Sequence, residues 1–384
     1  MSQQHLTTTD KEQYQQLLDT KVATILSNLQ KAVHTALPEP AVYPSKPVHY
    51  RMRAEFAIYF DNDTMHYVMY KPNTKPKERI FVDSFDKAHE AIYKLMPDLS
   101  ALLQKDEELK HKLFEIDFLT NQKGDVIVSL IYHKKLDETS TLQRLEKLRD
   151  LLCHMGHKVS FTAHAKKQLI KCPDDTIVEE YKLKDGNVSL YQVEGTFTQP
   201  NATTCSAMLE FARECSQDMH NTDLLELYCG SGTFTTALAP YYRQVLATEV
   251  ARVPTQTALK NLRLNHIDNT KLVRLSALEV TQALNKERSF NRLNKQDIDL
   301  DSYNFKTLLI DPPRAGLASE EALSFTARFD RVIYISCGPE SFASDLSYLI
   351  RTHDIVKLSF FDQFPYTSHL ESGALLVKRG SDRG

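Results

Sequence analysis

A cysteine and an aspartate each follow a short apolar run in the second half of the chain. Cys337 comes shortly after Val332–Ile335, and Asp311 comes directly after Thr307–Ile310. In a parallel α/β sheet the carboxyl ends of the strands are where ligands bind, so both side chains are expected at a binding edge. Upstream, an apolar strand runs into the glycine turn Gly230–Gly232, which is typical of a nucleotide-type cofactor loop. Together these features predict a methyl-transferring enzyme with a covalent step.

Cys337 is the candidate nucleophile of that step. Carbon 5 of uracil is a poor nucleophile, but a thiolate that adds to carbon 6 turns the ring into an enolate, whose carbon 5 can attack an electrophilic methyl group. The alternative is a buried structural cysteine, since free cysteine is among the most buried residue types. Gly338 and Pro339 follow directly and favour a position at the rim of the sheet.

A base must then remove the proton from carbon 5 so that elimination releases the enzyme. Glu371, which comes just before the last predicted strand, is the acidic residue best placed to do this. Taken by itself, a glutamate in a loop is more often a solvated surface residue. His369 is a second candidate, whose alternative role is to shape the loop.

The glycine turn is a partial dinucleotide-binding fingerprint. Gly230 and Gly232 are present, but Thr235 stands where the third glycine is usual. Glu249 ends the next predicted strand about 20 residues further on, where an acidic side chain grips ribose hydroxyls. This spacing fits NAD and S-adenosylmethionine alike. Asp311–Arg314 is similar to the strand-end motif of methyltransferases that act on amino nitrogens, but an arginine replaces their usual aromatic residue, which argues against nitrogen as the target.

The bulk composition fits a soluble protein of two domains. The chain has 384 residues, 42% of them hydrophobic and 25% charged, with a formal net charge of −3. Its apolar runs are far shorter than the roughly 20 residues of a membrane span, and its N-terminus lacks the pattern of a secretion signal. The six cysteines form no Cys-x-x-Cys pair, which argues against a zinc or iron–sulfur site. We expect a cytoplasmic protein without a metal or a membrane partner.

Three regions of the chain differ in their sequence pattern. Residues 1–37 hold an amphipathic helix, expected over 8–37, and prolines after it mark an extended linker. Residues 38–189 mix alternating strands with helices, which predicts an α+β domain. Residues 190–384 alternate strands with helices, which predicts an α/β domain with a doubly wound, mostly parallel sheet.

The individual elements follow from hydrophobic periodicity and turn residues. In residues 38–189 we expect strands at 51–60, 65–70, 79–82, 114–119, 126–132 and 158–163, and helices at 86–96, 98–112 and 138–155. In residues 190–384 we expect strands at 223–228, 244–249, 271–275, 305–310, 331–336, 354–362 and 373–378. The helices expected there lie at 201–218, 233–240, 253–265, 277–285, 319–328 and 339–351.

Basic and aromatic residues gather in the first half of the chain. Residues 158–171 contain four lysines and no acidic residue, and residues 46–79 contain seven basic and four acidic side chains with four tyrosines interleaved. Lysine and arginine can neutralise phosphates while aromatic rings stack on splayed bases. The pattern indicates RNA binding, although an ordinary solvated sheet face gives a similar pattern.

Several longer blocks of the chain are distinctive enough to indicate a family. They are His49–Phe56, His111–Phe114, Tyr132–Asp137, Phe197–Asn201, Phe290–Leu293, Leu300–Tyr303 and Phe361–Thr367. In these blocks, from about residue 47 to 378, the chain resembles the tRNA (uracil-5-)-methyltransferases, which make ribothymidine in the T loop of bacterial tRNA. The resemblance implies a class I methyltransferase domain of Rossmann-like α/β fold, dependent on S-adenosylmethionine, with a separate RNA-recognition domain.

The resemblance also implies roles for individual residues. Cys337 takes the place of the nucleophile and Glu371 that of the base. The residues placed around the cofactor are Gln199, Tyr228, Gly230, Gly232, Thr233, Glu249 and Asp311. The residues placed near RNA are Arg51, Arg53 and Phe114. The implied target is uridine 54 in the T arm of tRNA, and other RNAs with a T-loop-like hairpin are further partners.

Two positions depart from the family pattern. Gly338 follows the nucleophile where asparagine is usual, and Thr233 stands in the cofactor loop where asparagine is common. The nearest alternative is the related ribosomal-RNA uracil methyltransferase, which carries an iron–sulfur cysteine cluster and a small N-terminal β-barrel. No cysteine precedes Cys153 here, and the chain starts in a predicted helix. A non-catalytic RNA-binding or RNA-folding protein is disfavoured because the nucleophile, the base and the strand-end aspartate are all present.

Overall fold

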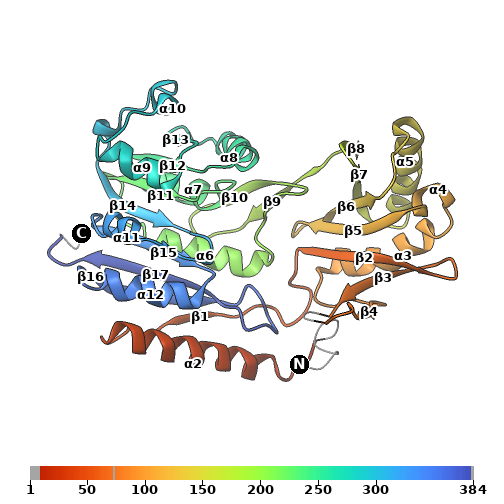
Figure 1. The fold of residues 1–384 in the computed structure, drawn as a ribbon, viewed down its shortest axis with the longest axis horizontal. Helices are drawn as coiled ribbons and strands as arrows, with labels where there is room; N and C mark the ends of the chain where they lie inside the picture. Colours follow the sequence, from red (N-terminus) through yellow and green to blue (C-terminus); the bar gives the residue numbers. More distant parts are fainter. Residues whose placement is uncertain (1–8, 72–73, 382–384) are drawn as a thin grey trace. The chain divides into compact units, whose positions relative to one another are not determined.

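The computed structural model describes residues 9–71 and 74–381, and the chain divides into two compact units (Figure 1). The first unit consists of the chain up to Tyr14, Lys46–Glu180 and Tyr191–Thr203. The second consists of Gln15–Ser45, Tyr181–Leu190 and the chain from Thr204 onward. Each unit therefore combines segments that lie far apart in the sequence.

A seven-stranded sheet forms the frame of the first unit. Its spatial order is β4–β3–β2–β5–β6–β7–β8. In that order the strands span Arg79–Phe81, Thr64–Tyr70, Arg53–Asp61, Leu113–Thr120, Asp125–Tyr132, Lys158–Ala165 and Gln168–Cys172. Neighbouring strands are antiparallel except β6 and β7, which are parallel because helix α5 (Glu138–His154) connects them.

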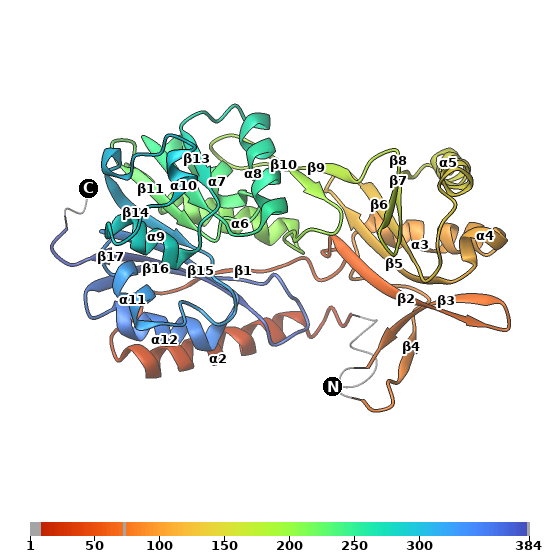
Figure 2. The ribbon, with the colours of Figure 1, turned by 45° about the horizontal axis from the view of Figure 1, so that its top comes forward.

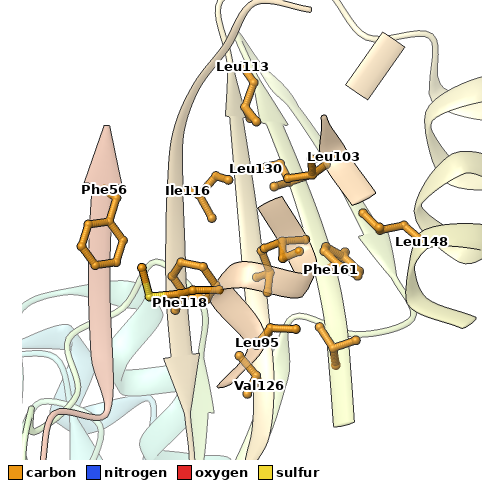
Figure 3. Packing of buried hydrophobic residues seen from close by; sticks show 14 of the residues in the cluster. Phe56, Leu95, Leu103, Leu113, Ile116, Phe118, Val126, Leu130, Leu148 and Phe161 are labelled. Carbon is orange, nitrogen blue, oxygen red and sulfur yellow. The ribbon is translucent and has the colours of Figure 1, made fainter. Parts of the chain in front are cut away.

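Alternating apolar residues give this sheet one buried face. Figure 3 shows Ile116 of β5, Leu130 of β6 and Phe161 of β7 gathered with Leu95 of helix α3 (Glu90–Leu103). All four side chains are completely buried. Because successive strand residues point to opposite faces, only every second residue joins this core. Each such side chain contributes about 1.5–3 kcal/mol to folding relative to an exposed position.

Helix α3 corrects one of the predicted boundaries. The sequence pattern predicts two helices, at 86–96 and 98–112, but α3 continues through Pro97 and a separate short helix α4 spans Glu107–Lys110. Pro97 lacks the N–H that would bond one turn back, which weakens the helix. Packing outweighs this loss. The buried face of α3 consists of Ile92, Leu95, Met96, Leu99 and Leu103.

Four strands lie where the sequence pattern predicts none: β1 (Ala41–Tyr43), β8, β9 (Thr176–Tyr181) and β10 (Val188–Val193). β9 and β10 form a separate two-stranded sheet. β1 lies in the proline-rich linker and pairs in parallel with β16 (His353–Phe361). Short strands of this kind depend on the neighbour they pair with more than on their own composition.

An eight-stranded sheet organises the second unit, in the order β1–β16–β17–β15–β14–β11–β12–β13. From β17 to β13 the strands span Glu371–Lys378, Arg331–Ser336, Phe305–Ile310, Asp223–Leu227, Gln244–Thr248 and Thr270–Val273. All neighbouring pairs are parallel except those of β17, which runs antiparallel to both β15 and β16. The predicted α/β sheet, mostly parallel, is confirmed.

Helices connect these strands, as the alternating pattern predicts. They are α6 (Ala202–Glu214), α7 (Thr233–Leu238), α8 (Arg252–Leu264), α9 (Ala277–Leu284), α10 (Asn291–Asn294), α11 (Glu320–Thr326) and α12 (Pro339–Leu349). Short 3-10 turns lie at Ala239–Tyr241 and Leu300–Ser302. Pro339 occupies the first turn of α12, where its missing N–H costs nothing, so strand β15 passes sharply into a helix.

The N-terminal helix α2 (Tyr14–Val33) belongs almost entirely to the second unit. It is shorter than the predicted helix 8–37, whose first residue lies outside the described residues. Asp10 accepts hydrogen bonds from the N–H groups of Glu12 and Gln13, at 3.1 and 3.2 Å, just before the helix begins. Figures 1 and 2 both show α2 next to α12. No helix in the described part of the chain is both long and apolar enough to span a membrane.

Candidate active site

The turn after β11 takes left-handed backbone conformations at three positions. The angle φ is +61° at Tyr228, +54° at Gly230 and +78° at Gly232. Glycine adopts such angles without steric cost, whereas Tyr228 stores about 1–3 kcal/mol of strain, as is common at functional sites. A Cβ atom at Gly232 would lie 3.1 Å from the Cβ atom of Ala258 on α8. The glycines therefore permit both the turn and its close packing against α8.

The carboxylate of Glu249 joins the end of β12 to this turn. One oxygen accepts a hydrogen bond from the N–H of Gly230 at 3.1 Å, and the other accepts from the N–H groups of Val250 and Ala251 at 2.8 Å each. Hydrogen bonds between a carboxylate and backbone N–H groups are stronger than neutral ones. Glu249 thus holds the shape of the turn, and the remaining lone pairs of its oxygens can still accept from a ligand.

The sheet order brings polar strand ends to one edge. β14 and β15 are neighbours, and Asp311 and Cys337 directly follow them, as predicted. β17 is antiparallel to β15, and Ser372 lies opposite Ser336. Cys337 and Glu371 are the next residues beyond this pair, and the charge of Glu371 acts on the Cys337 thiol. The amino end of β17 therefore delivers a carboxyl group to the carboxyl end of β15. We call Asp311, Arg314, Cys337 and Glu371 the strand-end site.

Burial raises the pKa values of the acidic groups in the strand-end site. Glu371 is 7% exposed, and burial followed by the charge of Asp311 raises its pKa to about 8. Burial raises the pKa of Asp311 to about 7. The pKa of the half-buried Cys337 thiol is raised by burial, then by Glu371 and Asp311, while Arg314 acts in the opposite direction. Perturbed groups in mutual contact of this kind are typical of functional sites.

Another buried carboxyl near this edge is absent from the predicted site residues. Glu226 of β11 is 1% exposed, and its Oε2 atom has no hydrogen-bond partner among the described residues. Burial raises the pKa of Glu226 to about 8, hydrogen bonding from Thr235 opposes this shift, and the charge of Asp311 adds to it. The signal in the sequence is a single acidic residue inside the apolar run Leu224–Leu227.

The departure from the family pattern at Gly338 has a steric explanation. A Cβ atom there would lie 2.5 Å from the carbonyl oxygen of Arg314 and 2.6 Å from Oγ of Ser341. Real Cβ atoms do not approach backbone oxygens that closely. Ser341 occupies the space and donates a hydrogen bond to the Arg314 carbonyl at 2.7 Å. In this chain a serine one turn into α12 anchors the loop that carries Arg314.

The first unit carries an exposed aromatic pair beside a basic cavity. Phe114 is 42% exposed and stacks on His133 with the ring centroids 4.0 Å apart. His133 also lines a cavity of about 740 Å³ at the ends of β6 and β7, and no carboxyl group is among its described lining residues. We call Phe114, His133, Lys134, Lys135 and Lys166 the aromatic–basic surface.

The cations around this cavity differ in their availability. Lys134 donates a hydrogen bond to a backbone carbonyl at 2.6 Å. The ring of His164 lies 2.9 Å from the carboxylate of Glu194, and this hydrogen bond raises the pKa of His164. Lys135 and Lys166 are exposed at the rim of the cavity. These two lysines are therefore the cations best placed to meet an anionic ligand.

Arg51 and Arg53 make contacts inside the first unit. Nε of Arg51 donates to the carbonyl of Arg53 at 2.8 Å. Nε of Arg53 donates to the carboxylate of Glu55 at 2.9 Å, and its Nη1 donates to the carbonyl of Thr196 at 2.8 Å. The two guanidinium groups thus organise the start of β2. Their contact with RNA stays a prediction.

The predicted cofactor residues fall in both units. Gln199 belongs to the first unit. Those of the second unit are Tyr228, Gly230, Gly232, Thr233, Glu249 and Asp311. Thr233 is the first residue of α7, and Gly232 before it provides no side-chain cap. The cofactor contacts of all seven residues stay predictions.

One acidic group among the described residues has metal-ligand spacing. Oxygen atoms of Glu55, Glu115 and Asp117, on β2 and β5, lie within 4.8 Å of one another. Burial, followed by the charges of Glu115 and Glu55, raises the pKa of Asp117 to about 7. A proton on one carboxyl near neutral pH relieves the repulsion among the three. The expectation that the protein uses no metal stays a prediction.

Comparison with known proteins decides the family. A family model described as tRNA (Uracil-5-)-methyltransferase matches residues 13–379. The chain belongs to this family. Proteins named tRNA/tmRNA (uracil-C(5))-methyltransferase from Photobacterium profundum, Psychromonas ingrahamii and Pseudomonas putida are 41%, 43% and 44% identical to it. The alignments cover 95%, 96% and 96% of this chain and 97%, 98% and 99% of those proteins. As a member of the tRNA (uracil-5-)-methyltransferase family, the protein is an enzyme of the S-adenosylmethionine-dependent class.

A solved structure shows the same fold. The Pyrococcus abyssi tRNA (uracil-54, C5)-methyltransferase, in complex with S-adenosyl-L-homocysteine, matches with a TM-score of 0.66 at 20% identity. The match covers 95% of this chain and 83% of that one. The class I methyltransferase fold predicted for this tRNA (uracil-5-)-methyltransferase family member is confirmed.

Proposed function

We propose that this family member transfers a methyl group from S-adenosylmethionine to carbon 5 of uridine 54 in the T loop of tRNA, which yields ribothymidine. The observation that carries the proposal is the antiparallel pairing of β15 with β17: Ser336 lies opposite Ser372, and the charge of the neighbouring Glu371 acts on the Cys337 thiol. A thiol nucleophile beside a carboxyl base, with Asp311 and Arg314 next to both, is the set of groups that carbon-5 methylation needs.

Cys337 acts first in the proposed reaction. Its sulfur forms a bond to carbon 6 of uracil, and the electrons of the 5,6 double bond move through the ring to give an enolate at oxygen 4. Burial and two carboxyls raise the pKa of the thiol, so the thiol first gives its proton to solvent, and Arg314 favours the resulting thiolate, which is the form that attacks. S-adenosylmethionine supplies the electrophilic methyl group that carbon 5 takes up.

Glu371 then completes the reaction. Its carboxylate takes the proton from carbon 5, the electron pair of that C–H bond re-forms the 5,6 double bond, and the bond between carbon 6 and the sulfur of Cys337 breaks. The methylated RNA and the thiolate are released. Because its pKa is raised to about 8, Glu371 is a stronger base, once ionised, than an ordinary glutamate.

The second unit offers a suitable set of groups for the cofactor. S-adenosylmethionine carries a positive sulfonium and a positive ammonium group, and buried carboxyls stabilise such charges. Near the glycine turn, Asp311 and Glu226 are two such buried carboxyls, and Oε2 of Glu226 has no hydrogen-bond partner among the described residues. We propose that Glu249 accepts hydrogen bonds from the ribose hydroxyls. The further residues of the second unit that we propose to hold the cofactor are Tyr228, Gly230, Gly232 and Thr233, and the cofactor contact of Gln199 in the first unit stays a prediction.

We propose that the aromatic–basic surface binds the RNA. The exposed ring of Phe114, held by its stack on His133, offers a face to a splayed base. Lys135 and Lys166 are positioned to neutralise backbone phosphates. Extrusion of a stacked uridine from a folded loop costs a few kcal/mol, and these contacts, with Arg51 and Arg53, offset part of it.

The names of the relatives favour a second RNA substrate. Those relatives are called tRNA/tmRNA (uracil-C(5))-methyltransferases. A T-loop-like hairpin in another RNA presents the same extruded uridine to the same site. We therefore infer that the enzyme also methylates such hairpins, including that of tmRNA.

Transfer of a radioactive methyl group from S-adenosylmethionine to unmodified tRNA tests the proposal. We expect one methyl group per tRNA and none on a matched transcript with cytidine at position 54. A transcript with 5-fluorouridine there should trap the enzyme as a slow band on a denaturing gel, because fluorine does not leave as a proton does. Equal methylation of the uridine and cytidine transcripts, or no trapped band, would contradict the proposal.

A further inference from the structure

Lys21 is a buried cation on the N-terminal helix. It is 9% exposed, whereas Lys31 on the same helix is exposed. Its ammonium group forms an ion pair with Asp362, whose side chain is completely buried, across 341 positions of sequence. Taking two charges out of water costs several kcal/mol per ion, and mutual attraction offsets this only when the remaining hydrogen bonds are satisfied.

The ammonium group of Lys21 has all of its hydrogen bonds satisfied by one loop. It has three N–H donors. They meet the carboxylate of Asp362, the carbonyl of Phe364 at 3.2 Å and the carbonyl of His369 at 3.1 Å. Burial lowers the pKa of Lys21, while the charge of Asp362 opposes this shift and favours the ammonium form. One side chain thus joins both ends of the loop 362–370.

This loop leads directly into the proposed base. His369 is followed by Leu370, which is buried, and then by Glu371 at the start of β17. Inside the loop, Oγ1 of Thr367 donates to the Phe364 carbonyl at 2.8 Å and accepts from the N–H of His369 at 3.1 Å. The two carbonyls that Lys21 binds are therefore the ends of one compact turn. A shift of that turn would therefore displace Glu371, which lies two positions after His369.

The geometry points to Lys21 as a positioning residue: from the N-terminal helix it holds the loop 362–370 so that Glu371 faces the methylated uracil bound to Cys337. This inference rests on the proposed function. A buried ion pair is weak evidence for stability, because apolar residues of similar volume often serve stability equally well. A role in placing one catalytic group gives a reason for a charge at this position.

The step that depends on Lys21 is release. Methyl transfer precedes the action of Glu371, so a displaced loop slows only proton removal and elimination. The experiment compares Lys21→Met with wild type and with Lys31→Met, an exposed control on the same helix, on unmodified tRNA. First-turnover methyl transfer by Lys21→Met should stay within about threefold of wild type, while steady-state turnover falls about 100-fold, the usual effect of a catalytic group misplaced by about 1 Å.

A second readout identifies the stalled species. Lys21→Met should accumulate a slow band on a denaturing gel that carries both RNA and methyl label, and Lys31→Met should not. Lys21→Arg, which keeps the charge and several donors, should recover part of the turnover. If Lys21→Met does not fold, Lys21→Gln decides instead: accumulation of the labelled band supports the inference, and release at the wild-type rate overturns it.

The outcomes separate this inference from the function it rests on. Normal release by Lys21→Met, or an equal fall of methyl transfer and release together with a lower melting temperature, would show a merely structural role. A wild-type enzyme that forms neither product nor adduct would instead overturn the proposed function itself.

Discussion

The strand-end site of the second unit and the aromatic–basic surface of the first unit use charged groups in opposite ways. In the strand-end site the carboxyls of Glu371 and Asp311 are buried or half-buried, and their pKa values are raised to about 8 and about 7. In the aromatic–basic surface Phe114 is 42% exposed, and Lys135 and Lys166 stand in solvent. The strand-end site shifts the pKa values of its carboxyls strongly, whereas the aromatic–basic surface leaves Lys135 and Lys166 accessible to a ligand.

The difference follows from the two tasks. Proton removal and thiol addition need groups whose pKa values lie near the working pH, and burial beside other charges produces such values. Phosphate binding needs accessible cations, and each contributes a small, salt-dependent share of the affinity. A single change in the strand-end site should therefore stop the reaction, whereas a single change in the aromatic–basic surface should weaken binding only gradually.

The largest effect is expected for Cys337→Ala. Without sulfur no bond to carbon 6 can form, so methyl transfer should fall to background and the 5-fluorouridine band should disappear. Binding of tRNA, measured by filter retention, should stay within about threefold because the aromatic–basic surface is intact. Measurable turnover by Cys337→Ala would show that the thiol is not the nucleophile.

Glu371→Gln should slow turnover by about 10²–10⁴-fold, the usual contribution of a general base. Adduct formation and methyl transfer precede proton removal, so this variant should retain methylated RNA bound through Cys337. A denaturing gel with label in both RNA and methyl group makes the adduct visible. Product release by Glu371→Gln at the wild-type rate would show that Glu371 is not the base. His369 would then be the next residue to substitute.

Glu249→Ala should weaken S-adenosylmethionine binding by about 1.5–3 kcal/mol, which is the usual loss for hydrogen bonds to a charged group. The structure adds a second reason, since the backbone N–H groups of Gly230 in the turn and of Val250 and Ala251 after β12 lose their acceptor. Calorimetry measures the affinity, and tRNA affinity serves as the control. Unchanged cofactor affinity would restrict Glu249 to a structural role.

The raised pKa of Glu371 predicts a pH dependence for release. A carboxyl whose pKa is about 8 is mostly protonated at pH 7, so its base form increases with pH. Decay of the methylated adduct after a pH jump should therefore quicken about fivefold between pH 7 and pH 8 and level off above pH 9. Measuring decay of a preformed adduct excludes the titration of Cys337. A decay rate that does not change with pH would contradict the raised pKa of Glu371 or its role as the base.

The smallest effect is expected in the aromatic–basic surface. Lys135→Ala combined with Lys166→Ala should lower tRNA affinity about tenfold at low salt and reduce the salt-dependence slope by about 1.4–1.8, because two phosphate contacts are lost. Lys147→Ala, at an exposed position of α5, is the matched control. An unchanged slope in the double variant would move the RNA contact away from this cavity.

Patterns that are local in the chain were enough to predict much of the strand-end site. The apolar runs before Asp311 and Cys337 and the glycine turn after β11 each depend on fewer than about ten consecutive residues, because strand and turn preferences act over that range. β14 and β15 accordingly end at Ile310 and Ser336, as predicted. Chemical reasoning about uracil gave Cys337 its role, and the family resemblance agreed with it and added the cofactor roles of Tyr228 and Asp311.

Contacts between distant segments were decided only by the tertiary structure. The place of Glu371 depends on the register of β17 against β15, and the burial of Lys21 depends on a partner 341 positions away. The persistence of α3 through Pro97 depends on a core contributed by other elements. Periodicity indicates which face of an element is apolar, but packing determines what that face meets. The sequence by itself therefore determined most of the elements and the reactive side chains, and the tertiary structure decided the short strands β1, β8, β9 and β10 and which side chains meet.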